Sequence, residues 1–147
     1  QDYVHSDDWR MAEIPSANGH GTAESLAKLF GILSTGCERD GITIMSEETL
    51  NTCLQPLSKG PDTVIFGAEI NFGTGFDLGL GLTTINQPSH PKTLFGHCGV
   101  GGCVGFGDIE NKIGYGFLCN RMHQPQDLYR TSNSLTSALY EIISQRT

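Results

Sequence analysis

The segment 94–105, LFGHCGVGGCVG, concentrates the residue types of this sequence that could do chemistry. It places His97, Cys98 and Cys103 among glycines and apolar residues. Three kinds of site would use such a segment: a metal or thiol-redox site, a loop that cradles phosphate, or one wall of an active site completed by other segments. Each of them requires a different spacing.

The spacing of His97, Cys98 and Cys103 argues against a metal site. Structural zinc sites usually combine two closely spaced cysteine pairs, whereas this chain has one Cys-x4-Cys spacing and no partner pair. Thiol-redox sites typically use Cys-x-x-Cys, which does not occur. We therefore expect no metal and no cofactor. A small metal or thiol-redox protein built on these three residues is kept as a hypothesis that ranks below the two given at the end of this subsection.

The glycines at 99, 101, 102 and 105 do not match a phosphate loop. They follow neither the G-x-x-x-x-G-K-[ST] pattern nor a G-x-G-x-x-G that opens a helix. They continue into a predicted strand instead. We interpret them as positions where a strand packs closely against a helix or a substrate.

Nucleophilic catalysis would need a serine with a base, and Ser25 and Lys28 have the S-x-x-K spacing in which an unprotonated lysine takes the serine proton. However, Leu26 and Leu29 define the buried face of the helix that carries Ser25. Ser25 is therefore interpreted as one member of an exposed surface pair that matches S-x-x-K without acting as a nucleophile.

A second S-x-x-K match, Ser89 to Lys92, contains Pro91, which opposes a helix there. No G-x-S-x-G nucleophile elbow is present. The remaining histidines are assigned no role: His5, His20, His90 and His123.

Composition limits the class of protein. The 147 residues fit one domain, and the net charge of −7 with only nine scattered basic residues disfavours binding to nucleic acid or to an anionic membrane surface. No apolar run approaches the roughly 20 residues that span a bilayer. Five cysteines leave at least one unpaired, so we expect reduced thiols and a location that leans towards the cytoplasm. The start at Gln1, without an initiator Met or a signal peptide, suggests a processed or partial product.

The elements that must position these residues divide the chain into four parts: a lead-in loop over 1–21, two helices over 22–56, antiparallel strands over 63–120 and a C-terminal helix over 126–145. Thr22 and Ser46 are expected to cap the two helices. Strands are expected at 63–69, 71–78, 93–97, 103–108 and 113–120.

Apolar residues at helical spacing are expected to form the buried faces of the helices. In the first helix these are Leu26, Leu29, Phe30 and Leu33; in the C-terminal helix they are Leu128, Leu135, Leu139, Ile142 and Ile143. The C-terminal helix is expected to lie across one face of the sheet. The fold class is thus α/β (α+β), an antiparallel sheet packed with helices.

Taken together, WRMAEIPSANGHGTAESLAKLFGIL (9–33), LFGHCGVGGCVGFGDIENKIGYGFLCNRM (94–122) and the C-terminal helix resemble the C-terminal part of the serine β-lactamase-related hydrolases. That family includes class C β-lactamases, esterases of the same fold and penicillin-binding proteins. The most specific matches are P-S-A-N-G-H-G-T-A and F-G-H-x-G-x-G-G. The resemblance implies the C-terminal portion of a β-lactamase/transpeptidase-like fold, as a single partial domain over 1–147.

The resemblance also implies site residues. The family uses S-x-x-K, Y-x-N and a strand motif K-T-G or H-x-G, and His97-Cys98-Gly99 matches the third. The Val100 N–H would be an oxyanion donor, and Gly99 would let substrate approach the backbone. His97 would stand where relatives often use lysine, and Cys98 would replace the threonine.

The other two motifs are not in place. S-x-x-K would belong upstream of the PSANG segment, and Y-x-N is absent because Tyr3, Tyr115, Tyr129 and Tyr140 all fail it. The leading hypothesis is thus the C-terminal segment of a serine hydrolase that acts on a small ester, amide or lactam through an acyl-enzyme, inactive alone. The alternative is a non-catalytic binding or assembly module, associating with a missing half or with itself.

Overall fold

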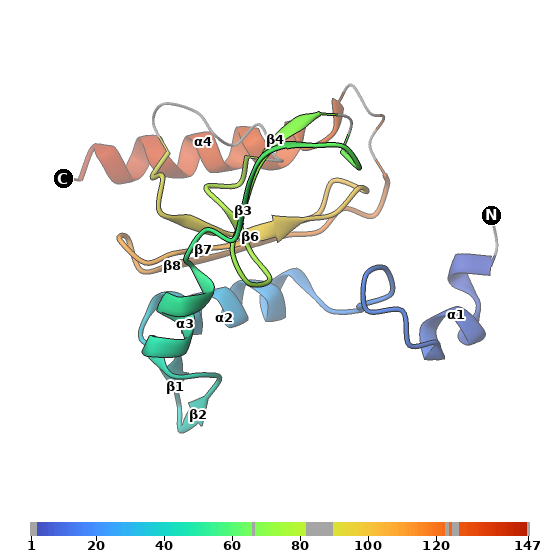
Figure 1. The fold of residues 1–147 in the computed structure, drawn as a ribbon, viewed down its shortest axis with the longest axis horizontal. Helices are drawn as coiled ribbons and strands as arrows, with labels where there is room; N and C mark the ends of the chain where they lie inside the picture. The colour runs from blue at the N-terminus through green and yellow to red at the C-terminus, as the bar shows by residue number, and fades with distance from the viewer. Residues whose placement is uncertain (1–2, 66, 82–89, 123, 125–126, 147) are drawn as a thin grey trace.

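An antiparallel sheet is the framework of the chain, and its described strands follow one another in sequence order, β3-β4-β5-β6-β7-β8. The computed structural model describes residues 3–65, 67–81, 90–122, 124 and 127–146 (Figure 1). The helices are η1 Tyr3–His5, α1 Asp7–Met11, α2 Ala23–Ser34, α3 Glu47–Cys53 and α4 Arg130–Ser144. The strands are β1 Glu38–Arg39, β2 Ile42–Thr43, β3 Ser58–Asp62, β4 Ala68–Phe72, β5 Asp77–Leu78, β6 Leu94–Cys98, β7 Val104–Asp108 and β8 Ile113–Phe117. The predicted mixed α/β class with an antiparallel sheet is confirmed.

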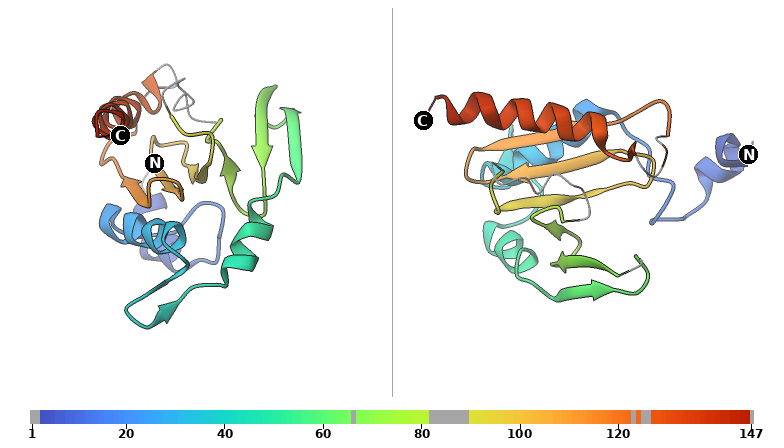
Figure 2. Two further views of the ribbon diagram at one scale, coloured as in Figure 1. Left: turned by 90° about the vertical axis from the view of Figure 1, so that its left-hand side faces the viewer. Right: turned by 90° about the horizontal axis from the view of Figure 1, so that it is seen from above.

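Helices cover both faces of the central strands, with α2 on one face and α4 on the other (Figure 2). The face towards α2 has a core of Phe30, Leu33, Cys37, Leu50 and Phe95. The face towards α4 has a core of Leu80, Leu94, Val104, Phe106, Tyr129 and Tyr140. Because successive residues of a strand point to opposite faces, Leu94 and Phe95 enter different cores.

Glycines on β7 and β8 let α2 approach the sheet closely. A Cβ built on Gly114 would overlap the backbone of Ala27 and Gly31 in α2, and one on Gly105 would lie 2.8 Å from the side chains of Leu26 and Phe30. The interpretation of Gly105 as a close-packing position is confirmed. By contrast, Gly102 lies in a turn and has a φ of 101°.

The N-terminus of α2 is fixed by a reciprocal cap. Thr22 Oγ1 accepts from the Ser25 N–H at 3.1 Å, and Ser25 Oγ accepts from the Thr22 N–H at 3.0 Å. The predicted cap at Thr22 is confirmed, as is the cap of α3 at Ser46. One expected core residue is wrong: Leu29 is 41% exposed, because α2 meets the sheet through Leu26, Ala27, Phe30 and Gly31.

The first two expected strands are misplaced. Most of 63–69 is the turn between β3 and β4, because Asp62 Oδ1 accepts from the N–H groups of Val64 at 2.7 Å and Ile65 at 2.9 Å. The range 71–78 is broken by a turn in which the Gly73 N–H donates to Phe76 O at 3.0 Å. The range 1–21 is also not all loop, since Ser6 caps the short helix α1 by accepting from the Trp9 N–H.

The C-terminal helix covers the sheet as expected, and of its expected apolar face Leu128 and Ile143 pack against the core whereas Leu135 and Ile142 do not. Its buried residues are Ser132, Thr136 and Tyr140, whereas Leu135 is 50% and Ile142 52% exposed. The sheet already presents large side chains here, so two of the three buried positions of α4 are small hydroxyl residues and only one is large. Among the described helices, none is long and apolar enough to cross a membrane.

Candidate active site

The end of β6 carries the His97-Cys98-Gly99 motif in the middle of the sheet. Here β6 lies between β5 and β7, and His97 is paired with Gly105 while Cys98 is paired with Val104. Because the strand alternates, His97 and Cys98 point to opposite faces. The two side chains therefore serve different surroundings.

His97 is exposed and stacks on Phe72 of β4, with ring centroids 5.8 Å apart and an interplanar angle of 18°. Its Nδ1 lies 2.8 Å from Cys98 O. Since a carbonyl oxygen only accepts hydrogen bonds, Nδ1 must carry the proton. The Nε2 atom is then an acceptor in the neutral ring and a donor in the imidazolium.

Cys98 lies on the other face, packed against the core under α4. Burial raises the pKa of the Cys98 thiol, and the nearby Asp77 carboxylate raises it further, whereas a hydrogen bond with Tyr129 acts in the opposite direction. With its pKa raised, Cys98 remains a thiol at neutral pH. A thiol is a poor nucleophile, so Cys98 has a packing role here.

A tight turn follows β6. The Gly99 N–H donates to Cys103 O at 2.8 Å, and the Gly102 N–H donates to Gly99 O at 2.9 Å. Val100 is 79% exposed at the top of this turn, and its N–H has no acceptor in the part of the chain that the structure describes. The Val100 N–H is thus an unpaired backbone donor among the described residues of this turn, three residues after His97 in the chain.

Two further cysteines, Cys103 and Cys119, lie next to each other beside this turn. Cys119, after β8, donates from Sγ to Gly101 O at 3.0 Å, and its Sγ lies 3.9 Å from Cys103 Sγ. Burial raises the pKa of the Cys119 thiol, with Cys103 as the next contribution. Among the described residues, no three His, Cys, Asp or Glu side chains form a group that could hold a metal ion. The set of His97, Cys98 and Cys103 is not assembled.

Tyr129, which does not match Y-x-N, is a further residue in contact with the His97-Cys98-Gly99 motif. It precedes α4 and its hydroxyl donates to Gly99 O at 3.1 Å. Burial raises the pKa of Tyr129, followed by its interactions with Cys98, so the hydroxyl stays protonated at neutral pH. No local pattern could have revealed this contact.

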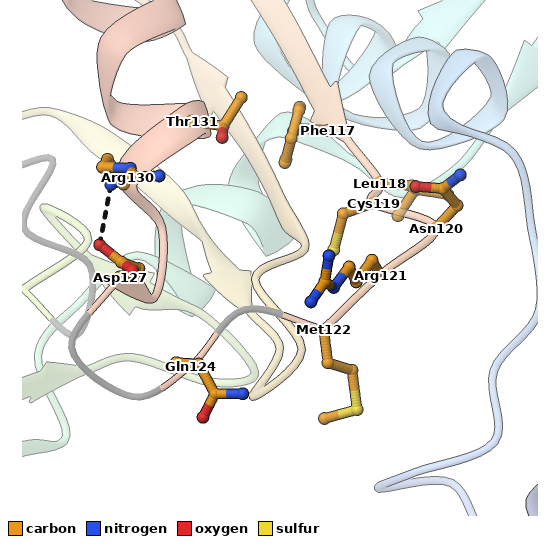
Figure 3. A pocket seen from close by; sticks show the side chains of 10 residues that line it. All are labelled: Phe117, Leu118, Cys119, Asn120, Arg121, Met122, Gln124, Asp127, Arg130 and Thr131. Carbon is orange, nitrogen blue, oxygen red and sulfur yellow. Dashed lines mark ion pairs between the residues drawn. The ribbon is translucent and has the colours of Figure 1, made fainter.

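A cavity of about 700 Å³ lies beside the turn, between 117–122 and the start of α4 (Figure 3). Arg130 forms an ion pair with Asp127 at 3.0 Å on one side of it, and Arg121 lies on the other. The side chain of Met122 approaches Gly101, so the cavity borders the turn.

The serines considered as nucleophiles lie elsewhere. Ser25 is engaged in the cap of α2, where its Oγ also donates to Thr22 O at 2.9 Å, and Lys28 is exposed. Ser89, in the second S-x-x-K match, lies outside the described residues. The hydrogen bonds of Ser25 are therefore those of a helix-capping residue.

Comparison with known proteins places the chain in a family. The family model described as Beta-lactamase matches residues 1–137. The chain is 32% identical over 135 residues to the esterase/beta-lactamase LipL of Mycobacterium tuberculosis, a match that covers 91% of this chain and 29% of that protein.

Solved structures are similar over most of the chain. A family VIII carboxylesterase superposes with a TM-score of 0.74 at 27% identity, covering 91% of this chain and 36% of that chain. A penicillin-binding protein homologue from Caulobacter crescentus superposes with a TM-score of 0.73 at 28% identity, covering 90% of this chain and 36% of that chain. The chain spans little more than a third of these relatives at most, and its sequence and fold show that it belongs to the beta-lactamase family.

Proposed function

We propose that this chain forms one wall of the active site of a serine hydrolase that cleaves a small ester, amide or lactam through an acyl-enzyme. The observation that carries the proposal is the N–H of the exposed residue Val100, which directly follows His97-Cys98-Gly99 and has no acceptor among the described residues. Family membership supports the same chemistry, because the relatives are named as an esterase/beta-lactamase, a carboxylesterase and a penicillin-binding protein homologue.

An acyl transfer needs donors aimed at the oxygen that becomes negative in the transition state. In this proposal the Val100 N–H is one such donor, and Gly99 leaves room for the substrate because it has no side chain. His97 lies at the entrance, where its Nε2 accepts a hydrogen bond when the ring is neutral and, when protonated, donates one and attracts a substrate carboxylate.

The 147 residues carry no Y-x-N, and their described S-x-x-K serine, Ser25, caps a helix. We therefore expect no turnover by this chain alone and activity in a longer protein that carries an upstream S-x-x-K. Both proteins are to be assayed with a chromogenic ester and a chromogenic cephalosporin, each with His97→Ala and Ser25→Ala variants. Activity of the 147 residues alone that either variant abolishes would overturn this assignment.

A non-catalytic assembly module is the second candidate. It is favoured by the outer edge of β8, which has no neighbouring strand in the described sheet, and by the half-exposed Leu135 and Ile142. Sedimentation of the purified chain tests it: self-association supports a module that assembles, whereas a compact monomer with cooperative unfolding counts against it.

A further inference from the structure

Tyr129 connects α4 to the turn that carries the proposed oxyanion donor. It is only 8% exposed, and its hydroxyl donates to Gly99 O at 3.1 Å across 30 residues of sequence. The hydroxyl of Tyr129 thus reaches the backbone of the His97-Cys98-Gly99 motif from the side opposite to His97.

The oxygen that Tyr129 binds belongs to the same peptide unit as the Val100 N–H. A peptide unit is planar, so fixing the direction of the Gly99 carbonyl also fixes the direction of the Val100 N–H. Gly99 O accepts a second hydrogen bond from the Gly102 N–H at 2.9 Å. Two donors on the carbonyl also polarise the amide, which makes the N–H at its other end a stronger donor.

The backbone of Tyr129 has an unusual conformation, which indicates that the position of its side chain is determined by the packing around it. Its φ of 66° and ψ of 0° lie in the left-handed region, which bulky L-residues rarely adopt, and its side chain does not cap α4. The conformation is held while the ring is buried with Leu94, Val104 and Phe106 in the core under α4.

The charge state of Tyr129 suits a donor. The titratable groups that face it are Cys98, Cys103 and Asp77, and burial with these neighbours raises the pKa of its hydroxyl. The hydroxyl therefore keeps its proton throughout the neutral pH range.

We propose that Tyr129 is a positioning residue that holds the Gly99–Val100 peptide so that the Val100 N–H faces the oxyanion of the reaction. The proposal rests on the proposed function, because it assumes that this N–H is a donor to the substrate. Tyr129 itself does not touch the reacting atoms.

The first test is spectroscopic and needs no activity. In Tyr129→Phe, the Gly99 carbonyl ¹³C and the Val100 amide ¹H resonances of the 147-residue chain are expected to move upfield, because the carbonyl loses a donor. Tyr115→Phe is the matched control, since it removes a core hydroxyl that has no hydrogen-bond partner among the described residues. Unchanged Gly99 and Val100 resonances in a folded Tyr129→Phe chain would overturn the proposal.

A ring-fluorinated tyrosine at position 129 covers the case in which Tyr129→Phe does not fold. Fluorination makes the hydroxyl a stronger donor with little change in size, so the same two resonances are expected to move downfield. No movement in this variant would likewise contradict the proposal.

The second test uses the longer protein that carries the catalytic serine. Tyr129→Phe is expected to lower kcat about tenfold with KM nearly unchanged, less than the hundredfold or greater loss typical of removing an oxyanion donor outright. Tyr115→Phe is expected to leave both constants unchanged.

Val100→Pro, which removes the N–H itself, separates the two proposals. If Val100→Pro lowers kcat and Tyr129→Phe does not, the positioning role fails and the proposed function stands. If neither lowers kcat, the oxyanion assignment of Val100 fails, and the positioning role fails with it.

Discussion

The two faces of the central sheet are packed in opposite ways. Towards α2, strands β7 and β8 present Gly105, Gly107, Gly114 and Gly116, and the helix supplies the large side chains. Towards α4, the same strands present Val104, Phe106 and Tyr115, and the helix supplies Ser132, Thr136 and a single buried tyrosine, Tyr140. The difference follows from the two-residue period of a strand: V-G-F-G-D and I-G-Y-G-F place every glycine on one face and every larger residue on the other.

Complementarity of size, and not hydrophobicity alone, therefore selects which face of each helix is buried. On the α2 side Ala27 and Gly31 approach the strand backbone directly. On the α4 side two hydroxyl residues are fully buried while Leu135 and Ile142 remain half exposed. A buried hydroxyl is tolerated there because Thr136 Oγ1 donates to Ser132 O at 2.9 Å and Ser132 Oγ donates to Tyr129 O at 2.9 Å.

The largest effect is expected on the α2 face. Gly114→Ala adds a methyl group where the backbone of Ala27 and Gly31 lies, so α2 must move away from the sheet. We expect a loss of about 3 kcal/mol in the free energy of unfolding, measured by urea denaturation. Gly19→Ala is the control, because nothing lies within 4 Å of a Cβ at that position. Equal stability of Gly114→Ala and Gly19→Ala would mean that α2 does not pack closely on the sheet.

The α4 face is tested by a pair of neighbouring substitutions. Thr136→Leu inserts a large side chain at a fully buried position and is expected to cost about 2 kcal/mol, whereas Leu135→Gln on the half-exposed side is expected to change stability by less than about 0.5 kcal/mol. Urea denaturation of both variants decides the question. If Leu135→Gln instead cost more stability than Thr136→Leu, the side of α4 that carries Leu135 would be its buried face.

Tyr140→Phe probes the polar contact of the α4 face. The Tyr140 hydroxyl donates to the fully buried Asp108 carboxylate at 2.8 Å, and its loss is expected to cost about 1.5 kcal/mol at neutral pH. Asp108 keeps its hydrogen bonds from Asn111, so we do not expect unfolding.

The same variant has a pH signature. Burial, followed by the interaction with Asp108, raises the pKa of Tyr140 above its ordinary value of about 10. The unfolded chain therefore loses this proton first, and stability falls as the pH rises above about 10, by about 1.4 kcal/mol per pH unit for one such tyrosine. Unfolding measured across this range should show a shallower decline in Tyr140→Phe; an unchanged slope would contradict the role of Tyr140.

The smallest effect is expected at the N-terminus of α2. Ser25→Ala removes one half of the reciprocal cap with Thr22 and is expected to lower the stability by about 0.5 kcal/mol. Lys28→Ala, at the exposed other end of the S-x-x-K spacing, is the control and should stay within about 0.5 kcal/mol of the wild type, with no sign of coupling between the two residues. Non-additive effects of the two substitutions would indicate that Ser25 and Lys28 act together.

Much of the fold could be predicted where the signal is local. Thr22 and Ser46 begin helices because their side chains bind backbone N–H groups three residues ahead, and short β-type runs separated by glycine identify β6, β7 and β8. The strand expected at 63–69 is wrong because the side chain of Asp62 turns the backbone at Val64 and Ile65, against the strand preference of these β-branched residues.

The candidate site also has one part that could be predicted from local sequence and one part that could not. The segment from His97 to Val100 could be recognised from its own residues and from the resemblance they carry. Tyr129 could not, because its partner Gly99 lies 30 residues away and the contact exists only when α4 covers the sheet.

The sequence by itself therefore determined the helix caps, the glycine alternation of β7 and β8 and the H-x-G segment, since each depends on residues that are neighbours along the chain. Only the tertiary structure decided that α4 buries Thr136 and leaves Leu135 half exposed, and that Tyr129 reaches the Gly99 carbonyl. The physical reason is that burial and long-range hydrogen bonds depend on which surfaces fit together in space, and hydrophobic periodicity along one helix does not contain the shape of the sheet that it covers.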